Sequence, residues 1–66
     1  MMEFVQGEIY MTRDAREFTY LERRGGVLVF ESVGENEERL LTNLAGRYRW
    51  DDQVHPNDII GILGKR

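Results

Sequence analysis

The chain has 66 residues, no cysteine, one histidine and a formal net charge of −3, from 12 acidic and 9 basic side chains. This length allows one domain, residues 1–66, with a small core, and the lack of cysteine excludes disulfides and thiolate zinc sites. The acidic balance argues against a general nucleic-acid binder, and the absence of a signal-peptide pattern or an apolar run near the roughly 20 residues of a membrane helix favours a cytoplasmic location.

Turn signals at intervals near ten residues separate β-branched and aromatic runs, which is typical of a meander of short strands. Three strands are expected in the first half of the chain, over residues 7–12, 17–22 and 27–33. In the second strand, Phe18 and Tyr20 share one face because side chains alternate along a strand. Gly25 and Gly26 predict a hairpin turn, since glycine supplies positive φ. The third strand is the most apolar and is expected to be central.

Residues 34–50 allow two interpretations. One is a short helix over 36–45, capped by Asn36 and ended by Gly46, with its leucines facing the core. The other is a strand over 39–42, a turn, and a further strand over 47–50. The local pattern does not decide between them.

The C-terminal part predicts a tight turn at 56–58 and a final short buried strand at 59–63. Five or six short strands in a domain of this size are expected to close into an all-β barrel, because closure removes exposed sheet edges. A Src-homology-3-like barrel is the first choice and an OB-like barrel is the second.

The stretch Gly7-Glu-Ile-Tyr-Met-Thr-Arg-Asp-Ala-Arg resembles the Gly-x-x-Tyr-x-Thr-Arg-Asp-Gly-Arg opening of small uncharacterised proteins of tailed phages and prophages. Their later elements are matched in order by Gly46-Arg47-Tyr48 and Pro56-Asn57-Asp58-Ile59-Ile60. Ala15 departs from the usual glycine, which leaves the first turn type open because alanine resists positive φ. The resemblance favours the strand–turn–strand interpretation of 34–50. It also implies a phage-encoded accessory protein working in the bacterial cytoplasm.

Few residues offer catalytic chemistry. The chain has no cysteine nucleophile, and its single imidazole, His55, lies beside Pro56 in an expected loop. No nucleophile, base and orienting group are spaced as a catalytic trio, so we expect no enzyme activity and no cofactor. One histidine with the nearby aspartates is below the usual ligand count for zinc, so no metal site is expected.

Arginines and aromatic rings carry the functional signal. Arginine suits planar contacts with phosphate or carboxylate and also stacks on rings. The candidate ligand- or partner-binding residues are Arg13, Arg16, Tyr20, Arg47, Arg49 and Trp50. The competing structural interpretation makes Tyr48 and Trp50 core residues and pairs Arg47 and Arg49 with nearby acids.

The leading hypothesis is a non-enzymatic phage accessory protein that antagonises a host bacterial protein by direct contact, with acidic loops that suit a basic host surface. One alternative is a ligand-sequestering barrel that binds a nucleotide or another phosphate-bearing anion. Another is a structural or virion-assembly component. Self-association into a homo-oligomer is expected under each hypothesis, since a barrel of this size gains core by burying an apolar face against a copy.

Overall fold

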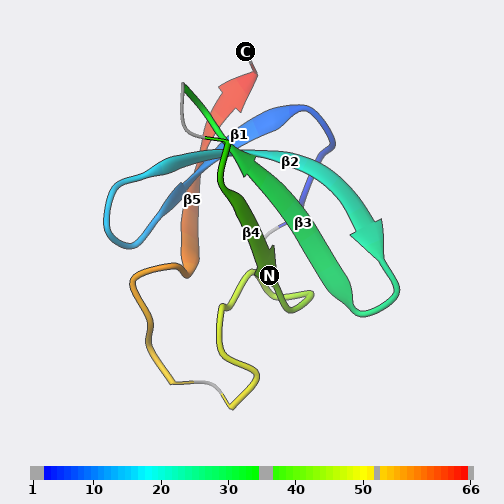
Figure 1. The fold of residues 1–66 in the computed structure, drawn as a ribbon, viewed down its shortest axis with the longest axis vertical. Coiled ribbons are helices and arrows are strands. Elements are labelled where there is room, and N and C mark those ends of the chain that lie inside the picture. Colours follow the sequence, from blue (N-terminus) through cyan, green and yellow to red (C-terminus); the bar gives the residue numbers. More distant parts are fainter. Residues whose placement is uncertain (1–2, 35–36, 52, 66) are drawn as a thin grey trace.

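A computed structural model describes residues 3–34, 37–51 and 53–65, and over these the protein is a single antiparallel sheet without a helix (Figure 1). Its strands are β1 (Glu8–Thr12), β2 (Glu17–Arg24), β3 (Val27–Ser32), β4 (Arg39–Thr42) and β5 (Ile59–Lys65). The strand order is β4-β3-β2-β1-β5. Consecutive strands from β1 to β4 are therefore neighbours, and β5 returns beside β1. The all-β prediction is confirmed, while the sheet remains open, with β4 and β5 as its edges.

The stretch after β3 forms a strand where the local pattern also allowed a helix. Residues 37–45 contain β4 and no helix, and Asn36, the proposed cap, lies outside the described residues. Leu40 pairs with Phe30 of β3 and is buried, whereas Leu41 points to the opposite face. The gain from packing Leu40 into the core outweighs the local helix signals. The prediction of a helix over 36–45 is therefore wrong for the described part of that segment.

The predicted strand over 47–50 is also wrong, because these residues are irregular. Gly46 adopts a φ of +80°, which turns the chain out of the sheet. The backbone N–H of Tyr48 then donates to the side chain of Asp58 instead of to a neighbouring strand. The segment belongs to a long connection between β4 and β5.

The core lies on one face of the sheet, and every strand contributes to it. Its buried members are Tyr10, Phe18, Tyr20, Leu28, Phe30, Leu40 and Ile59. Phe18 and Tyr20 share the core face, as predicted. The ring of Phe4 packs on this cluster from outside the sheet, 5.1 Å from Tyr10 and 5.8 Å from Phe30 between ring centroids. A chain segment before β1 thus covers the core.

That N-terminal segment is fastened by the hydroxyl of Tyr10. The oxygen accepts a hydrogen bond from the N–H of Val5 at 2.7 Å, and the hydroxyl donates to the carbonyl of Glu3 at 3.3 Å. The fixed segment brings Phe4 under Gly46, where a Cβ added to the glycine would lie 2.7 Å from the Phe4 ring. The approach of Phe4 therefore requires glycine at position 46.

The β1–β2 turn adopts a positive φ at Ala15, with a value of 68°. Side-chain and backbone bonds hold it there, since Thr12 Oγ1 bonds Asp14 and accepts from the N–H of Arg16 at 3.0 Å. The turn therefore holds alanine in the left-handed region, at the steric cost of a residue that has a Cβ. Among the described residues, no helix has the length and hydropathy needed to cross a bilayer.

Candidate functional site

The connection between β4 and β5, residues 43–58, is called the β4–β5 loop and lies at the lower end of Figure 1. Its first turn is closed by the side chain of Asn43, whose Oδ1 accepts from the N–H groups of Ala45 and Arg47, both at 2.9 Å. The carbonyl of Gly46 accepts from Ile59 N–H at 2.8 Å, at the start of β5. The two ends of the loop are therefore joined where they leave the sheet.

Asp58 is the central anchor of the loop and is fully buried. Its Oδ1 accepts from the N–H of Tyr48 at 2.8 Å, and its Oδ2 accepts from the N–H of His55 at 3.0 Å. The guanidinium groups of Arg13 and Arg47 each donate to Oδ2 at 3.3 Å. One carboxylate thereby connects the β1–β2 turn with two distant points of the loop.

The charge of Asp58 follows from a balance of opposing effects. Burial raises the pKa of its carboxyl, but hydrogen bonds from the amides of Tyr48 and His55, the bond from Arg13 and the charge of Arg47 together hold that pKa below its ordinary value. Hydrogen bonds to the ionised form and nearby positive charge both favour the carboxylate. Asp58 is therefore an anion at neutral pH, compensated by arginine on two sides.

Two stacked rings make a second contact between distant parts of the loop. The side chains of Tyr48 and His55 stack with centroids 4.3 Å apart and planes 29° from parallel. The Nδ1 of His55 accepts from the N–H of Asn57 at 3.0 Å, which makes that nitrogen an acceptor and orients the ring. The imidazole therefore has a structural task within the loop.

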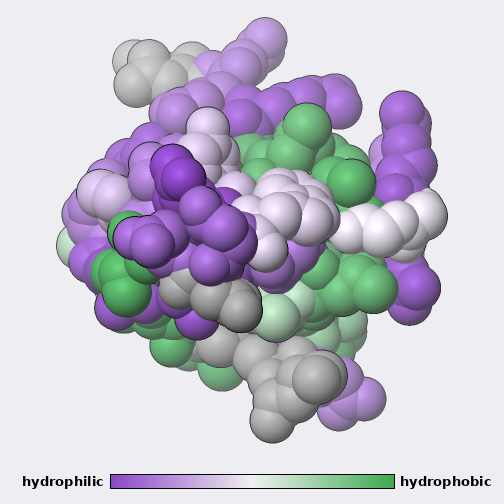
Figure 2. Space-filling view, turned by 90° about the horizontal axis from the view of Figure 1, so that it is seen from below, coloured by the Kyte–Doolittle hydropathy of each residue, from purple (hydrophilic) through white to green (hydrophobic). Residues whose placement is uncertain are grey.

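The loop tip exposes apolar surface. Trp50 is 59% exposed and Val54 is 67% exposed. Beside them, Arg49 donates two hydrogen bonds to the carboxylate of Asp51, at 2.7 and 3.1 Å. These bonds, together with a hydrogen bond from the backbone N–H of Gln53, lower the pKa of Asp51 to about 2. The charge of Arg49 is thus compensated by Asp51. Figure 2 views the molecule from this end and shows pale and green side chains among hydrophilic ones.

Arg16 forms a separate cluster on the β1–β2 turn. Its guanidinium contacts Asp14 at 2.9 Å, Glu38 at 3.0 Å and the side chain of Asn57, and it lies 5.4 Å from the centroid of the Phe18 ring. The bond with Asp14 raises the pKa of Arg16, while bonds from Thr12 and Arg16 lower that of Asp14. These contacts tie the turn to the β3–β4 connection and to the loop.

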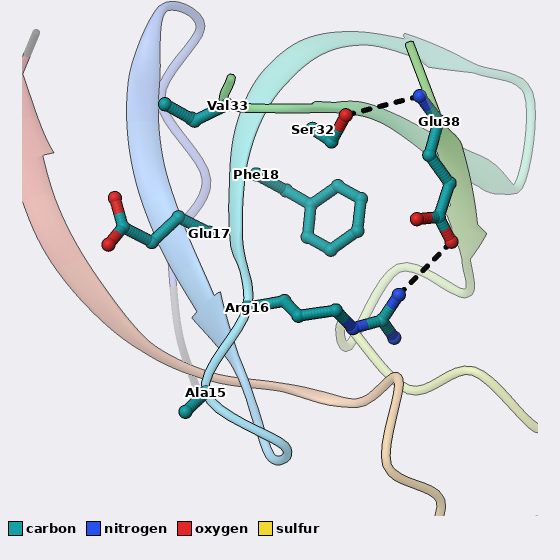
Figure 3. Close-up of a pocket in the computed structure, with 7 residues that line it drawn as sticks. All are labelled: Ala15, Arg16, Glu17, Phe18, Ser32, Val33 and Glu38. Carbon is teal, nitrogen blue, oxygen red and sulfur yellow. Dashed lines mark hydrogen bonds and ion pairs between the residues drawn. The ribbon is translucent and has the colours of Figure 1, made fainter. Parts of the chain in front are cut away.

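A groove of about 480 Å³ lies beside Arg16. It is lined by Ala15, Arg16, Glu17, Phe18, Ser32, Val33 and Glu38. Figure 3 shows the ring of Phe18 between the side chains of Ser32, Glu38 and Arg16, with the Arg16–Glu38 ion pair along one side. Because the guanidinium is already bonded to carboxylates, the groove offers no unpaired positive group from Arg16.

The predicted site residues divide into three groups. Arg13 and Arg47 both contact Asp58, and Arg16 contacts the side chain of the neighbouring Asn57. Arg49 and Trp50 lie on the loop tip, where Arg49 pairs with Asp51 and Trp50 is exposed. Tyr20 is only 8% exposed and packs against Phe30 in the core, so its ring is not part of this surface.

The structural interpretation of residues 47–50 is partly right. Arg47 and Arg49 do form ion pairs with nearby acids, but Tyr48 and Trp50 are exposed and not in the core. Sequence reasoning missed the role of Asp58, which it treated as a turn residue. The sequence signal that could have indicated this role is the position of Asp58 directly before the apolar residues Ile59 and Ile60. An acidic residue at the start of an apolar strand is brought close to the core.

Over the described residues, no group of three or more histidine, cysteine, aspartate or glutamate side chains is placed to hold a metal ion. Comparisons with protein-family models, curated proteins and solved structures find no match to this chain.

Proposed function

We propose that this chain is a non-enzymatic binding protein that contacts another protein through the tip of the β4–β5 loop. The observation that carries the proposal is Trp50, largely exposed on a loop that the buried Asp58 fastens at its base. Tryptophan is over-represented among residues that dominate binding energy, and a side chain presented by a pre-ordered loop loses less entropy on binding. The tip combines both properties.

The proposed class of partner, a host bacterial protein, comes from the resemblance to phage proteins. That resemblance supports a phage or prophage accessory protein that antagonises a host factor in the bacterial cytoplasm, in host inhibition or counter-defence. The negative net charge of the chain supports a basic surface on that host protein, since opposite charge speeds association. The structural use of His55 in a ring stack and as an acceptor supports a role without catalysis.

The anion-sequestering alternative draws less support. Arg13, Arg16, Arg47 and Arg49 each contact a carboxylate of this chain at 3.3 Å or less. A phosphate would have to displace these partners, and for Asp58 that would leave a buried charge unpaired. The engaged guanidiniums therefore favour the protein-contact proposal.

We also propose that the open sheet is a partly closed barrel of the Src-homology-3-like kind. Three features support this closure. Strands β1 to β4 form a meander and β5 returns beside β1. All five strands contribute side chains to a single core, and Phe4 covers that core. The barrel would leave the β4–β5 loop projecting from one end, where it is free to contact a partner.

Replacing Trp50 with alanine is expected to weaken partner binding at least tenfold and to leave the midpoint of thermal unfolding nearly unchanged. The side chain is mostly exposed, so its loss removes contact area without opening the core. The measurement is affinity capture from bacterial lysate on the immobilised full chain, followed by titration of the captured protein. Ile62→Ala is the matched control, since Ile62 is an exposed apolar residue on β5.

Equal binding by the Trp50→Ala chain would contradict the proposal, and capture of a virion protein would favour an assembly role. The anion-sequestering alternative is tested by measuring the unfolding temperature of the chain with a panel of mononucleotides, dinucleotides and cyclic nucleotides. No stabilisation is expected from any of them. A ligand-dependent rise in the unfolding temperature, following the mass-action law for a bound ligand, would favour sequestration instead.

A further inference from the structure

The free edge of the sheet at β4 presents unpaired backbone groups. The N–H of Ser32 donates to the carbonyl of Glu38 at 2.8 Å, and β4 continues in register with Leu40 opposite Phe30. Hydrogen-bonded pairs alternate along an antiparallel ladder, so Leu40 bonds to β3 while Arg39 and Leu41 turn their N–H and C=O groups away from it. Within the described part of the chain, no backbone partner meets these groups.

A groove lies beside this edge, on the face of the sheet opposite the core. It has a volume of about 550 Å³ and is lined by Glu22, Arg24, Val27, Val29, Arg39 and Leu41. Val29 and Leu41 are cross-strand partners and, with Val27, form its apolar floor. Leu41 is 50% exposed, although it lies on a strand next to the core.

The charges around the groove are paired with each other. Glu22 contacts Arg24 at 3.2 Å, and Glu31 contacts Arg39 at 3.9 Å. Each guanidinium that lines the groove therefore has a carboxylate partner, Glu22 within the lining for Arg24 and Glu31 outside the lining for Arg39. The chemistry of the groove favours an uncharged, apolar occupant.

We infer that the β4 edge and this groove together bind an extended peptide segment of a partner protein. The segment would add a strand by pairing with the outward backbone groups of Arg39 and Leu41. Its apolar side chains, at alternate positions, would lie beside Leu41 and enter the groove. Strand addition of this kind takes affinity from the backbone and specificity from side-chain pockets. The inference concerns a different surface from the loop tip and does not depend on Trp50.

The edge and the groove together favour this occupant over others. A helix or a small apolar molecule would fill the groove but leave the outward N–H and C=O groups of β4 unpaired. A second copy of the chain could pair through its own β4, but the alternate positions on this face would be Arg39, Leu41 and Asn43, with one apolar side chain among them. A segment with successive apolar alternate residues fits the groove better than a second β4 does.

The test uses the full chain and a display library of random decapeptides, followed by titration with a synthetic peptide of the selected consensus. Selected peptides are expected to carry apolar residues at alternate positions and to shift the amide resonances of Arg39 and Leu41 most strongly. Leu41→Glu should weaken the peptide at least tenfold. Ile62→Glu is the matched control, because Ile62 is 52% exposed on the other edge strand, and it should bind normally.

Leu41→Ala, which introduces no charge, should bind several-fold more weakly and guards against misfolding of the glutamate variant. The inference would be overturned if no selected peptide bound the unmodified chain more tightly than it bound Leu41→Glu. Resonance shifts confined to residues 48–55 would also overturn it. Light scattering that shows a dimer of the free chain, dissociated by Leu41→Glu, would assign the edge to a second copy instead.

Discussion

Replacing Asp58 with alanine is expected to lower the free energy of unfolding by about 2–6 kcal/mol, because each of two backbone N–H groups left without its acceptor costs about 1–3 kcal/mol. The substitution removes the acceptor of two backbone N–H groups and leaves Arg13 and Arg47 facing a partly buried gap. Small domains have a total stability of about 5 kcal/mol. The variant should therefore keep at most about 3 kcal/mol of stability and unfold at a much lower urea concentration than the unmodified chain, which urea titration followed by circular dichroism would show.

Asp51→Ala is the matched control for this prediction. Asp51 also binds an arginine, at 2.7 Å, but the pair is exposed at the loop tip. Exposed pairs contribute little to stability because water and salt screen them. The urea midpoint of Asp51→Ala should stay near that of the unmodified chain, and equal losses in the two variants would contradict the assigned role of Asp58.

Acid should reproduce part of the Asp58 effect. The folded-state pKa of Asp58 lies below the ordinary value of 3.8, so its contribution to stability is complete above that value and is lost as pH falls through the folded-state pKa. The difference in urea midpoint between the unmodified chain and Asp58→Asn should be constant from neutral pH down to about pH 5. It should then shrink below pH 3.8. A difference that grows in acid would contradict the ionised state.

The second large effect is expected at Gly46. An alanine there would adopt a φ of +80° and place its Cβ 2.7 Å from the Phe4 ring and 3.3 Å from Ile59. The left-handed conformation costs about 1–2 kcal/mol, and overpacking adds about 1–3 kcal/mol. We expect Gly46→Ala to lose about 2–5 kcal/mol in urea unfolding, by displacing Phe4 from Tyr10 and Phe30.

Gly25→Ala separates the two contributions. Gly25 also has a positive φ, of +59°, but no atom lies within 4 Å of an added Cβ. This control should lose only the cost of the left-handed backbone. If both alanine variants lost the same free energy of unfolding, the close approach of Phe4 to Gly46 would contribute nothing to stability. The packing of the N-terminal segment over the core would then be wrong.

The strands could be predicted where alternation and turn residues agree. Phe18 and Tyr20 point to one face because the strand period is two, and the glycine hairpin after β2 requires positive φ at Gly25. Residues 36–50 could not be predicted in the same way. The conformation of β4 depends on the pairing of Leu40 with Phe30 of the preceding strand, a tertiary contact that local propensity does not contain.

The candidate site shows the same division between local and distant information. The arginines could be identified by residue type, but the contact between Arg13 and Asp58 spans 45 residues of sequence and appears only in the folded chain. The exposure of aromatic rings is likewise a result of packing. Tyr20 and Trp50 were equivalent candidates in the sequence, and the fold buries the first and exposes the second.

If Asp58 orders the loop that presents Trp50, the backbone amides of Tyr48 and His55 should be protected from hydrogen exchange. Both amides donate to the Asp58 carboxylate, at 2.8 and 3.0 Å. We expect their exchange to be at least about 100-fold slower than in an unstructured peptide, and this protection to be lost in Asp58→Asn while the Phe30 amide of β3 stays protected. Free-peptide exchange rates at Tyr48 and His55 in the unmodified chain would contradict the claim.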